Sequence, residues 1–293
     1  MQSRGADFSH QHPAASVKLE TISCMVTMKG VGANRRRLAW FGGLVTAALV
    51  VFWSELPISS ALAAPRCPAL PVPAWVPEDP LQSAYPMPWC WVWGMQTQAQ
   101  RTRRSLWGTT QSPVLVSPDG RYSVFSRVQI LAHRNYTRTQ VTSTLHIRRP
   151  GGALPIVLRP LGQPRAVQPG QIWVLVPVSW SADGSQLLVR QVAGWFGSSE
   201  ISDSALVWQN DGAEVRAVMP QAVTHTHSLL LGWSRETPTS ILFETRLLGL
   251  ERASLWQVGL DGLTLAARED APVTYGQSQG EAWTMLEYRL WRR

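Results

Sequence analysis

Residues 114–125 read VLVSPDGRYSVF, which is an apolar run, a four-residue turn and a second apolar run. In the turn, Pro118 presets its own φ, Asp119 can accept hydrogen bonds from nearby backbone amides, and Gly120 tolerates a positive φ. The chain is therefore expected to reverse here, and the two apolar runs are predicted to form neighbouring antiparallel strands.

The same unit recurs three more times. Residues 178–189 read VSWSADGSQLLV, and looser copies occupy residues 231–244 and 273–285. The first three copies continue into two further apolar runs each, at residues 143–147 and 154–158, 204–208 and 214–219, and 254–258 and 263–267. Recurring four-strand units of this size are typical of a β-propeller or a related array.

The predicted fold class is all-β, a small β-propeller-like array of about four blades. Its aligned positions, Val116, Trp180, Trp233 and Tyr275, are expected on inner strands where blades pack. The fourth copy lacks two strands. We expect residues 89–94 and 105–108 to supply them and to meet residues 282–288, so that N- and C-terminal strands share one blade. An open arc or a two-sheet sandwich remains the alternative, and no helix is predicted beyond residue 88.

The repeat resembles that of the TolB-type periplasmic β-propellers. Ser117 to Gly120 fits the family's Ser-Pro-Asp-Gly turn fully, Ser181 to Gly184 fits with alanine at 182, and Ser234 to Glu236 fits in outline. The resemblance implies a propeller blade, but it does not imply one function. Related blades serve as partner-binding scaffolds and as lids of prolyl-oligopeptidase-like enzymes.

The N-terminal region predicts export. Arg35-Arg36-Arg37 precedes an uncharged apolar run at residues 38–53, and Ala61-Leu62-Ala63 fits a cleavage site. Residues 1–63 are therefore interpreted as an N-terminal extension and signal peptide, with an uncleaved anchor as the alternative. Residues 64–88 form a proline-rich leader and residues 89–293 the β-propeller-like domain. Both interpretations place the domain outside the cytoplasm, in a bacterial periplasm or secreted.

Two cysteines, Cys67 and Cys90, follow the signal. In an oxidising compartment such a pair is expected to form a structural disulfide. Two buried free thiols are the alternative.

The candidate contact residues are loop aromatics and clustered arginines. Trp195 and Phe196 lie between two glycines, where exposed rings would be available to a partner, and the arginines are Arg101, Arg103 and Arg104. The net charge is +8 at pH 7. Because an exported protein seldom meets nucleic acid, the expected partner is another envelope or secreted protein.

No catalytic, metal-binding or cofactor-binding residue is predicted. Residues 276–280 match the Gly-x-Ser-x-Gly pattern of serine hydrolases, yet no histidine follows, so Ser278 is interpreted as part of a blade turn. His225 and His227 could offer two metal ligands but lack a visible third. No phosphate loop, dinucleotide motif or haem motif occurs.

The resulting hypothesis is an exported, non-enzymatic binding or scaffold protein that acts through protein contact. A glycan- or peptidoglycan-binding module that uses exposed tryptophan is the alternative, with Trp89, Trp91 and Trp93 as one candidate stripe. A serine hydrolase is a third, weaker hypothesis.

Overall fold

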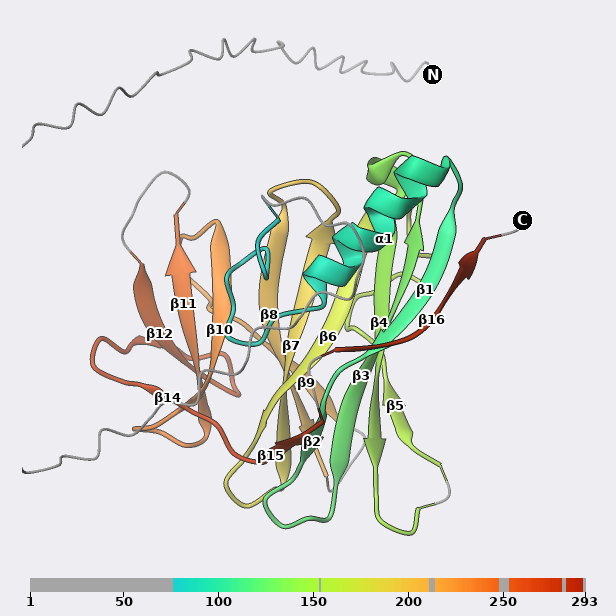
Figure 1. Ribbon diagram of the computed structural model, residues 1–293. Helices are drawn as coiled ribbons and strands as arrows, with labels where there is room; N and C mark the ends of the chain where they lie inside the picture. The colour runs from blue at the N-terminus through green and yellow to red at the C-terminus, as the bar shows by residue number, and fades with distance from the viewer. Residues whose placement is uncertain (1–75, 153, 211–213, 248–252, 281–282, 292–293) are drawn as a thin grey trace, which may run out of the picture. The chain divides into compact units, whose positions relative to one another are not determined.

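The described part of the chain is mostly β-structure. The computed structural model describes residues 76–152, 154–210, 214–247, 253–280 and 283–291. Within these ranges the strands form an 11-stranded mixed sheet and a 5-stranded sheet (Figure 1). The all-β prediction is confirmed at this level. Residues 1–63 and most of the leader lie outside the described ranges.

Three antiparallel four-stranded meanders coincide with the first three predicted copies. The first comprises β2 (Val114–Val116), β3 (Ser123–Ala132), β4 (Gln140–Arg148) and β5 (Ile156–Leu158). The second comprises β6 (Gln171–Trp180), β7 (Gln186–Trp195), β8 (Ile201–Gln209) and β9 (Val215–Val218). The third comprises β10 (His227–Ser234), β11 (Ser240–Arg246), β12 (Ser254–Gly259) and β13 (Thr264–Ala266). A parallel pairing of β4 with β6 joins the first two meanders into the larger sheet.

Helix α1 (Trp89–Thr102) replaces the strand that we predicted at residues 89–94. The alternating tryptophans suggested a strand, but the buried positions Val92, Met95 and Ala99 follow helical spacing. Gln96 completes this buried face, and its polarity hides the helical stripe from a search for apolar residues. The alternating-tryptophan stripe is thus wrong as a strand face.

Gln96 can be buried because its side chain is hydrogen-bonded. Its Nε2 donates to the carbonyl of His133 at 2.9 Å, and its Oε1 accepts from the hydroxyl of Thr139. The helix packs on the larger sheet in one hydrophobic cluster with residues of β1, β3, β4 and β6. Burial of one large apolar side chain of this kind stabilises the fold by about 1.5–3 kcal/mol.

The ends of the predicted domain meet, although in a simpler way than expected. Strand β1 (Leu106–Gln111) overlaps the predicted 105–108 segment and pairs antiparallel with β16 (Thr284–Leu290). Because β1 pairs with β3 on its other edge, it extends the first meander instead of completing a separate blade. Among the described strands, neither sheet closes on itself.

The fourth copy is divided among β16 and two shorter strands. Strand β14 (Pro272–Val273) pairs with β10, and β15 (Gln277–Gln279) pairs with β2. The predicted turn at residues 276–280 is therefore wrong, since the middle of this segment is a strand. Gly276 and Gly280 flank it with φ of 102° and 95°, so glycine is required at both positions by backbone conformation.

The first two predicted turns are organised by a serine–aspartate hydrogen bond. The hydroxyl of Ser117 donates to Asp119 at 2.6 Å, and that of Ser181 donates to Asp183 at 2.6 Å. These bonds favour the ionised carboxylate. The bond from Ser117, followed by the backbone N–H of Arg121, lowers the pKa of Asp119 to about 2. The pKa of Asp183 is lowered in the same way, first by Ser181.

The third turn obtains its carboxylate from far along the chain. Ser234 occupies the serine position, and its hydroxyl donates to Asp270 at 2.6 Å. Asp270 also accepts from the backbone N–H groups of Arg235 (3.1 Å) and Glu236 (3.3 Å). Burial acts to raise the pKa of Asp270, but these hydrogen bonds outweigh it and the pKa is lowered.

The described end of the leader is fixed to the second meander by a buried ion network. Arg190 on β7 is 0 % exposed and donates to Asp79 at 2.8 Å and to Asp203 on β8 at 2.7 Å. Asp79 also accepts from backbone N–H groups of the leader itself, at Leu81, Ser83 and Met87. Burial raises the pKa of Asp203 in spite of the adjacent guanidinium. Residues 79–87 are thus an integral part of the folded domain.

The predicted inner-strand aromatics contribute to the core. Trp180 and Trp233 are both fully buried. The ring of Trp180 stacks on Tyr122 with centroids 5.7 Å apart, and its backbone N–H donates to the carbonyl of Tyr275 at 3.0 Å. Trp180 thereby connects the second meander to the first and to the fourth copy.

Candidate contact surface

The two predicted loop aromatics have different environments. Phe196 is 3 % exposed and packs on Trp89 and Trp93 of α1, with ring centroids 5.5 and 4.9 Å apart. It is a core residue, and its proposed role as an exposed contact is wrong. Trp195 is 38 % exposed, so its contact role stays a prediction.

The predicted arginine cluster lies where α1 ends. Arg101, Arg103 and Arg104 are all exposed, and Arg103 ends the helix in a left-handed conformation with φ of 53°. The next residue, Ser105, accepts a backbone hydrogen bond from Trp291 at 2.9 Å. The arginine cluster is therefore adjacent to the C-terminal end of β16.

Strand β16 carries an apolar surface that the sequence reasoning missed. Every one of its residues is exposed. The large apolar side chains on it and directly after it are 42 to 51 % exposed: Met285, Leu286, Tyr288, Leu290 and Trp291. A signal was present in the sequence, because residues 284–291 lack the apolar–polar alternation expected of a strand with one solvated face. Isolated exposed apolar residues are ordinary, but five within one strand and its end form a patch.

The same strand is an edge. Among the described strands β16 pairs with β1 alone, and its other side has no neighbouring strand (Figure 1). A bulge interrupts the pairing with β1 at Leu286, so that residues 287–290 form the regular part. An exposed edge strand with apolar side chains is a template for pairing with another chain.

The two faces of the regular part differ in chemistry. Tyr288 lies opposite Gly108 of β1, where a Cβ would come within 2.8 Å of Met95 and 3.1 Å of Trp91 of the helix. Tyr288 and Leu290 are therefore on the face that α1 covers. Glu287 and Arg289 are on the other face, with the guanidinium of Arg289 4.8 Å from the ring centroid of Trp107.

A pair of partly exposed rings occurs near the loop that follows β7. Tyr136 of the short 3₁₀ helix Tyr136–Arg138 is 42 % exposed, and its ring lies over Gly197, where a Cβ would be 2.6 Å from it. Trp195 lies against Gly170, and the carbonyl of Gly170 accepts from the N–H of Phe196 at 2.7 Å. Both glycines have positive φ, so the loops can approach the rings closely.

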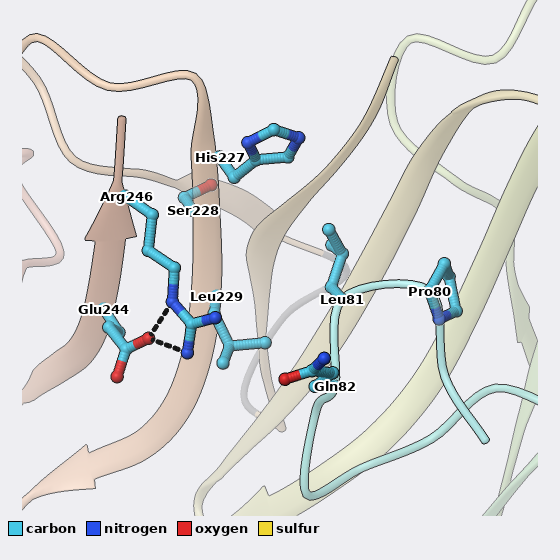
Figure 2. Close-up of a pocket in the computed structure, with 8 residues that line it drawn as sticks. All are labelled: Pro80, Leu81, Gln82, His227, Ser228, Leu229, Glu244 and Arg246. Atoms are coloured by element: carbon cyan, nitrogen blue, oxygen red, sulfur yellow. Dashed lines mark hydrogen bonds and ion pairs between the residues drawn. The ribbon is translucent and has the colours of Figure 1, made fainter. Parts of the chain in front are cut away.

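A small pocket of about 180 Å³ lies between the leader and the third meander (Figure 2). Leu81 and Gln82 of the leader form one wall, and Glu244 and Arg246 of β11 lie across from them, joined by an ion pair at 2.6 Å. Ser228 also lines the pocket, but its hydroxyl donates to the carbonyl of Asp203 at 2.6 Å. This serine is a hydrogen-bond donor to the backbone and has no base beside it that would activate it.

The residues considered for chemistry are not brought together. Ser278 is exposed on β15. The two imidazoles make separate contacts, that of His225 with the carbonyl of Val223 at 2.9 Å and that of His227 with Thr226 at 3.0 Å. Within the described ranges no group of three or more His, Cys, Asp or Glu side chains could hold a metal ion.

The cysteine prediction can be followed at one partner. Cys90 lies in α1, is 8 % exposed and is disulfide-bonded. Cys67 lies outside the described residues, so the pairing of Cys67 with Cys90 stays a prediction. Among the described helices none is long and apolar enough to cross a membrane, and residues 38–53 lie outside that search.

Comparison with known proteins adds little. No protein-family model matches the chain, and no curated protein matches it. A solved structure named "Glycoside hydrolase" is similar at 9% identity with a TM-score of 0.33, over 59% of this chain and 60% of that one. A second, described as a complex of BT0996 and RGII, is similar at 11% identity and the same TM-score, over 64% and 67%. The chain thus spans less than two thirds of the first structure, and at these TM-scores neither structure bears on function.

Proposed function

We propose that this is an exported, non-enzymatic binding or scaffold protein that pairs the exposed edge of β16 with an extended segment of another protein chain. The three meanders then act as blades of a small β-propeller-like array of about four units, whose fourth is made by the chain ends. The observation that carries the proposal is an apolar edge strand bordered by a cluster of arginines.

Strand addition uses both properties of β16. The unpaired backbone groups of an edge give affinity, and side chains on the two faces give selectivity. Burial of the apolar residues would supply the hydrophobic part of the binding free energy, at about 25 cal/mol per Å² of apolar surface. Export is supported by the disulfide at Cys90, because such bonds persist in oxidising compartments.

Site-specific crosslinking in cells tests this function. A photoreactive residue at Tyr288 is expected to yield a crosslinked protein product, because this position lies in the middle of the proposed contact strand. Val157 on β5 is the matched control, since it is 48 % exposed on another edge strand. Equal yields at both positions, or no product at Tyr288, would contradict the proposal.

Glycan binding is the second candidate, and the exposed rings of Trp195 and Tyr136 favour it. Flat aromatic side chains on adjacent loops can stack on sugar rings. Quenching or a shift of tryptophan fluorescence on addition of peptidoglycan fragments is expected, and a Trp195→Ala variant should abolish it. An identical response in that variant would rule out this site.

A further inference from the structure

We propose that the partner at β16 is a second copy of this chain, paired antiparallel about a two-fold axis that passes through Tyr288. The inference rests on the proposed function, because it names the occupant of the same edge. It is argued from the charges and the faces of β16.

The charges of β16 are complementary to themselves in this register. With the axis at Tyr288, Glu287 of one copy faces Arg289 of the other, and the symmetry repeats this contact, which gives two opposite-charge pairs. Neither residue is committed within its own chain, since the Glu287–Arg289 separation is 3.8 Å and both side chains are more than half exposed. Each is thus available to a partner strand.

Neighbouring registers are unfavourable for the same reason. An axis through Glu287 would place two carboxylates opposite each other, and an axis through Arg289 would do so with two guanidinium groups. Like charges directly opposite on a sheet are destabilising. A shift of one residue would also exchange the two faces of the strand. The charges therefore select the register centred on Tyr288.

The apolar face agrees with this register. Tyr288 would lie beside its own symmetry mate, on the face that α1 covers. Leu290, opposite the buried Leu106 of β1, would lie toward Leu286 of the partner. Pairing would thus extend the hydrophobic cluster beneath α1 across the axis. The arginine clusters would lie at opposite ends of the paired strands, because each is next to the end of its own β16.

A dimer formed by one pair of short strands is expected to be weak. Small interfaces fall in the range of transient complexes, so dissociation constants of about 10 μM are expected. The chain, in detergent if it remains membrane-bound, should be examined by sedimentation velocity up to about 100 μM.

Charge exchange gives the decisive experiment. Glu287→Arg alone and Arg289→Glu alone each place two like-charge pairs across the axis, and each should weaken dimerisation roughly tenfold or more. Mixing the two variants restores both opposite-charge pairs, so a mixed dimer should form. The double variant should dimerise by itself, and unchanged melting temperatures should show that all variants are folded.

The outcomes separate this inference from the proposed function. Restoration by mixing and in the double variant supports self-pairing at Tyr288. A chain that is monomeric up to about 100 μM, or dimers indifferent to both substitutions, overturns it. If the Tyr288 crosslink then contains a different protein, the proposed function stands with another partner. If position 288 also gives no crosslink, both proposals fail.

Discussion

At the scale of single residues, Arg190 is the most constrained side chain. It is fully buried and joined to two carboxylates that come from distant parts of the chain. Removal of one partner from a buried ion network leaves an uncompensated charge, which costs about 3–5 kcal/mol. The network is therefore expected to determine whether the leader stays attached.

The Asp79→Ala variant tests this expectation. It should lower the free energy of unfolding by about 3–5 kcal/mol, measured by urea denaturation, and expose residues 76–88 to protease. The control is Arg216→Ala, which removes an exposed ion pair with Glu214 and should change stability by less than about 1 kcal/mol. A loss no larger than that of the control would show that the network does not hold the leader.

Asp119 provides a pH-dependent prediction. Its pKa in the folded state is about 2, below the ordinary value of 3.8, so the folded state favours the ionised form. The stability that it contributes is present above pH 4 and is lost as the pH falls through the interval from about 4 to 2. An NMR titration should find this low pKa, and Ser117→Ala should raise it. An ordinary pKa in the unsubstituted protein would contradict the turn geometry.

At the scale of elements, the turns show how far local sequence reaches. The Ser-Pro-Asp-Gly turn and its second copy could be predicted, since every group that they need lies within four residues. The third turn could not be completed from its own sequence, because its carboxylate is Asp270. Helix α1 was missed because Gln96 interrupts its apolar stripe, and Phe196 because the helix that buries it was missed.

The Asp270→Ala variant should destabilise the third meander. It leaves the hydroxyl of Ser234 and the amides of Arg235 and Glu236 without their acceptor, a loss of about 1–3 kcal/mol. Asp261→Ala is the control, because Asp261 is exposed and accepts one backbone hydrogen bond, from Leu263. Thermal denaturation should show a clearly larger decrease for Asp270→Ala, and equal decreases would argue against a shared turn.

The contact strand illustrates the same limit. The sequence predicted a strand near residues 282–288 and placed it beside an N-terminal segment, which agrees with the pairing of β16 and β1. It did not indicate that the far side of β16 lacks a neighbour. An open edge is a property of the sheet as a whole, and no single residue of β16 encodes it.

At the scale of the whole molecule, the disulfide at Cys90 couples α1 to a segment of the chain outside the described residues. Its loss is expected to lower stability by about 2–5 kcal/mol. A reducing agent should therefore lower the melting temperature of the protein. The Cys90→Ser variant should show the lower value already and should not respond to the agent. Labelling with a thiol reagent before and after reduction identifies the second cysteine, and labelling of Cys67 only after reduction is expected.

The borrowed carboxylate of the third turn has a consequence for the order of folding. The hairpin of β10 and β11 emerges from the ribosome, or from an export channel, before Asp270 does, and β1 waits for β16, which comes almost last. Contacts between residues so far apart in sequence form slowly, because the intervening chain must first be ordered. The half-made molecule therefore exposes an unfinished turn and an unpaired strand until nearly its final residue is delivered, and this is the interval in which a chaperone would find it.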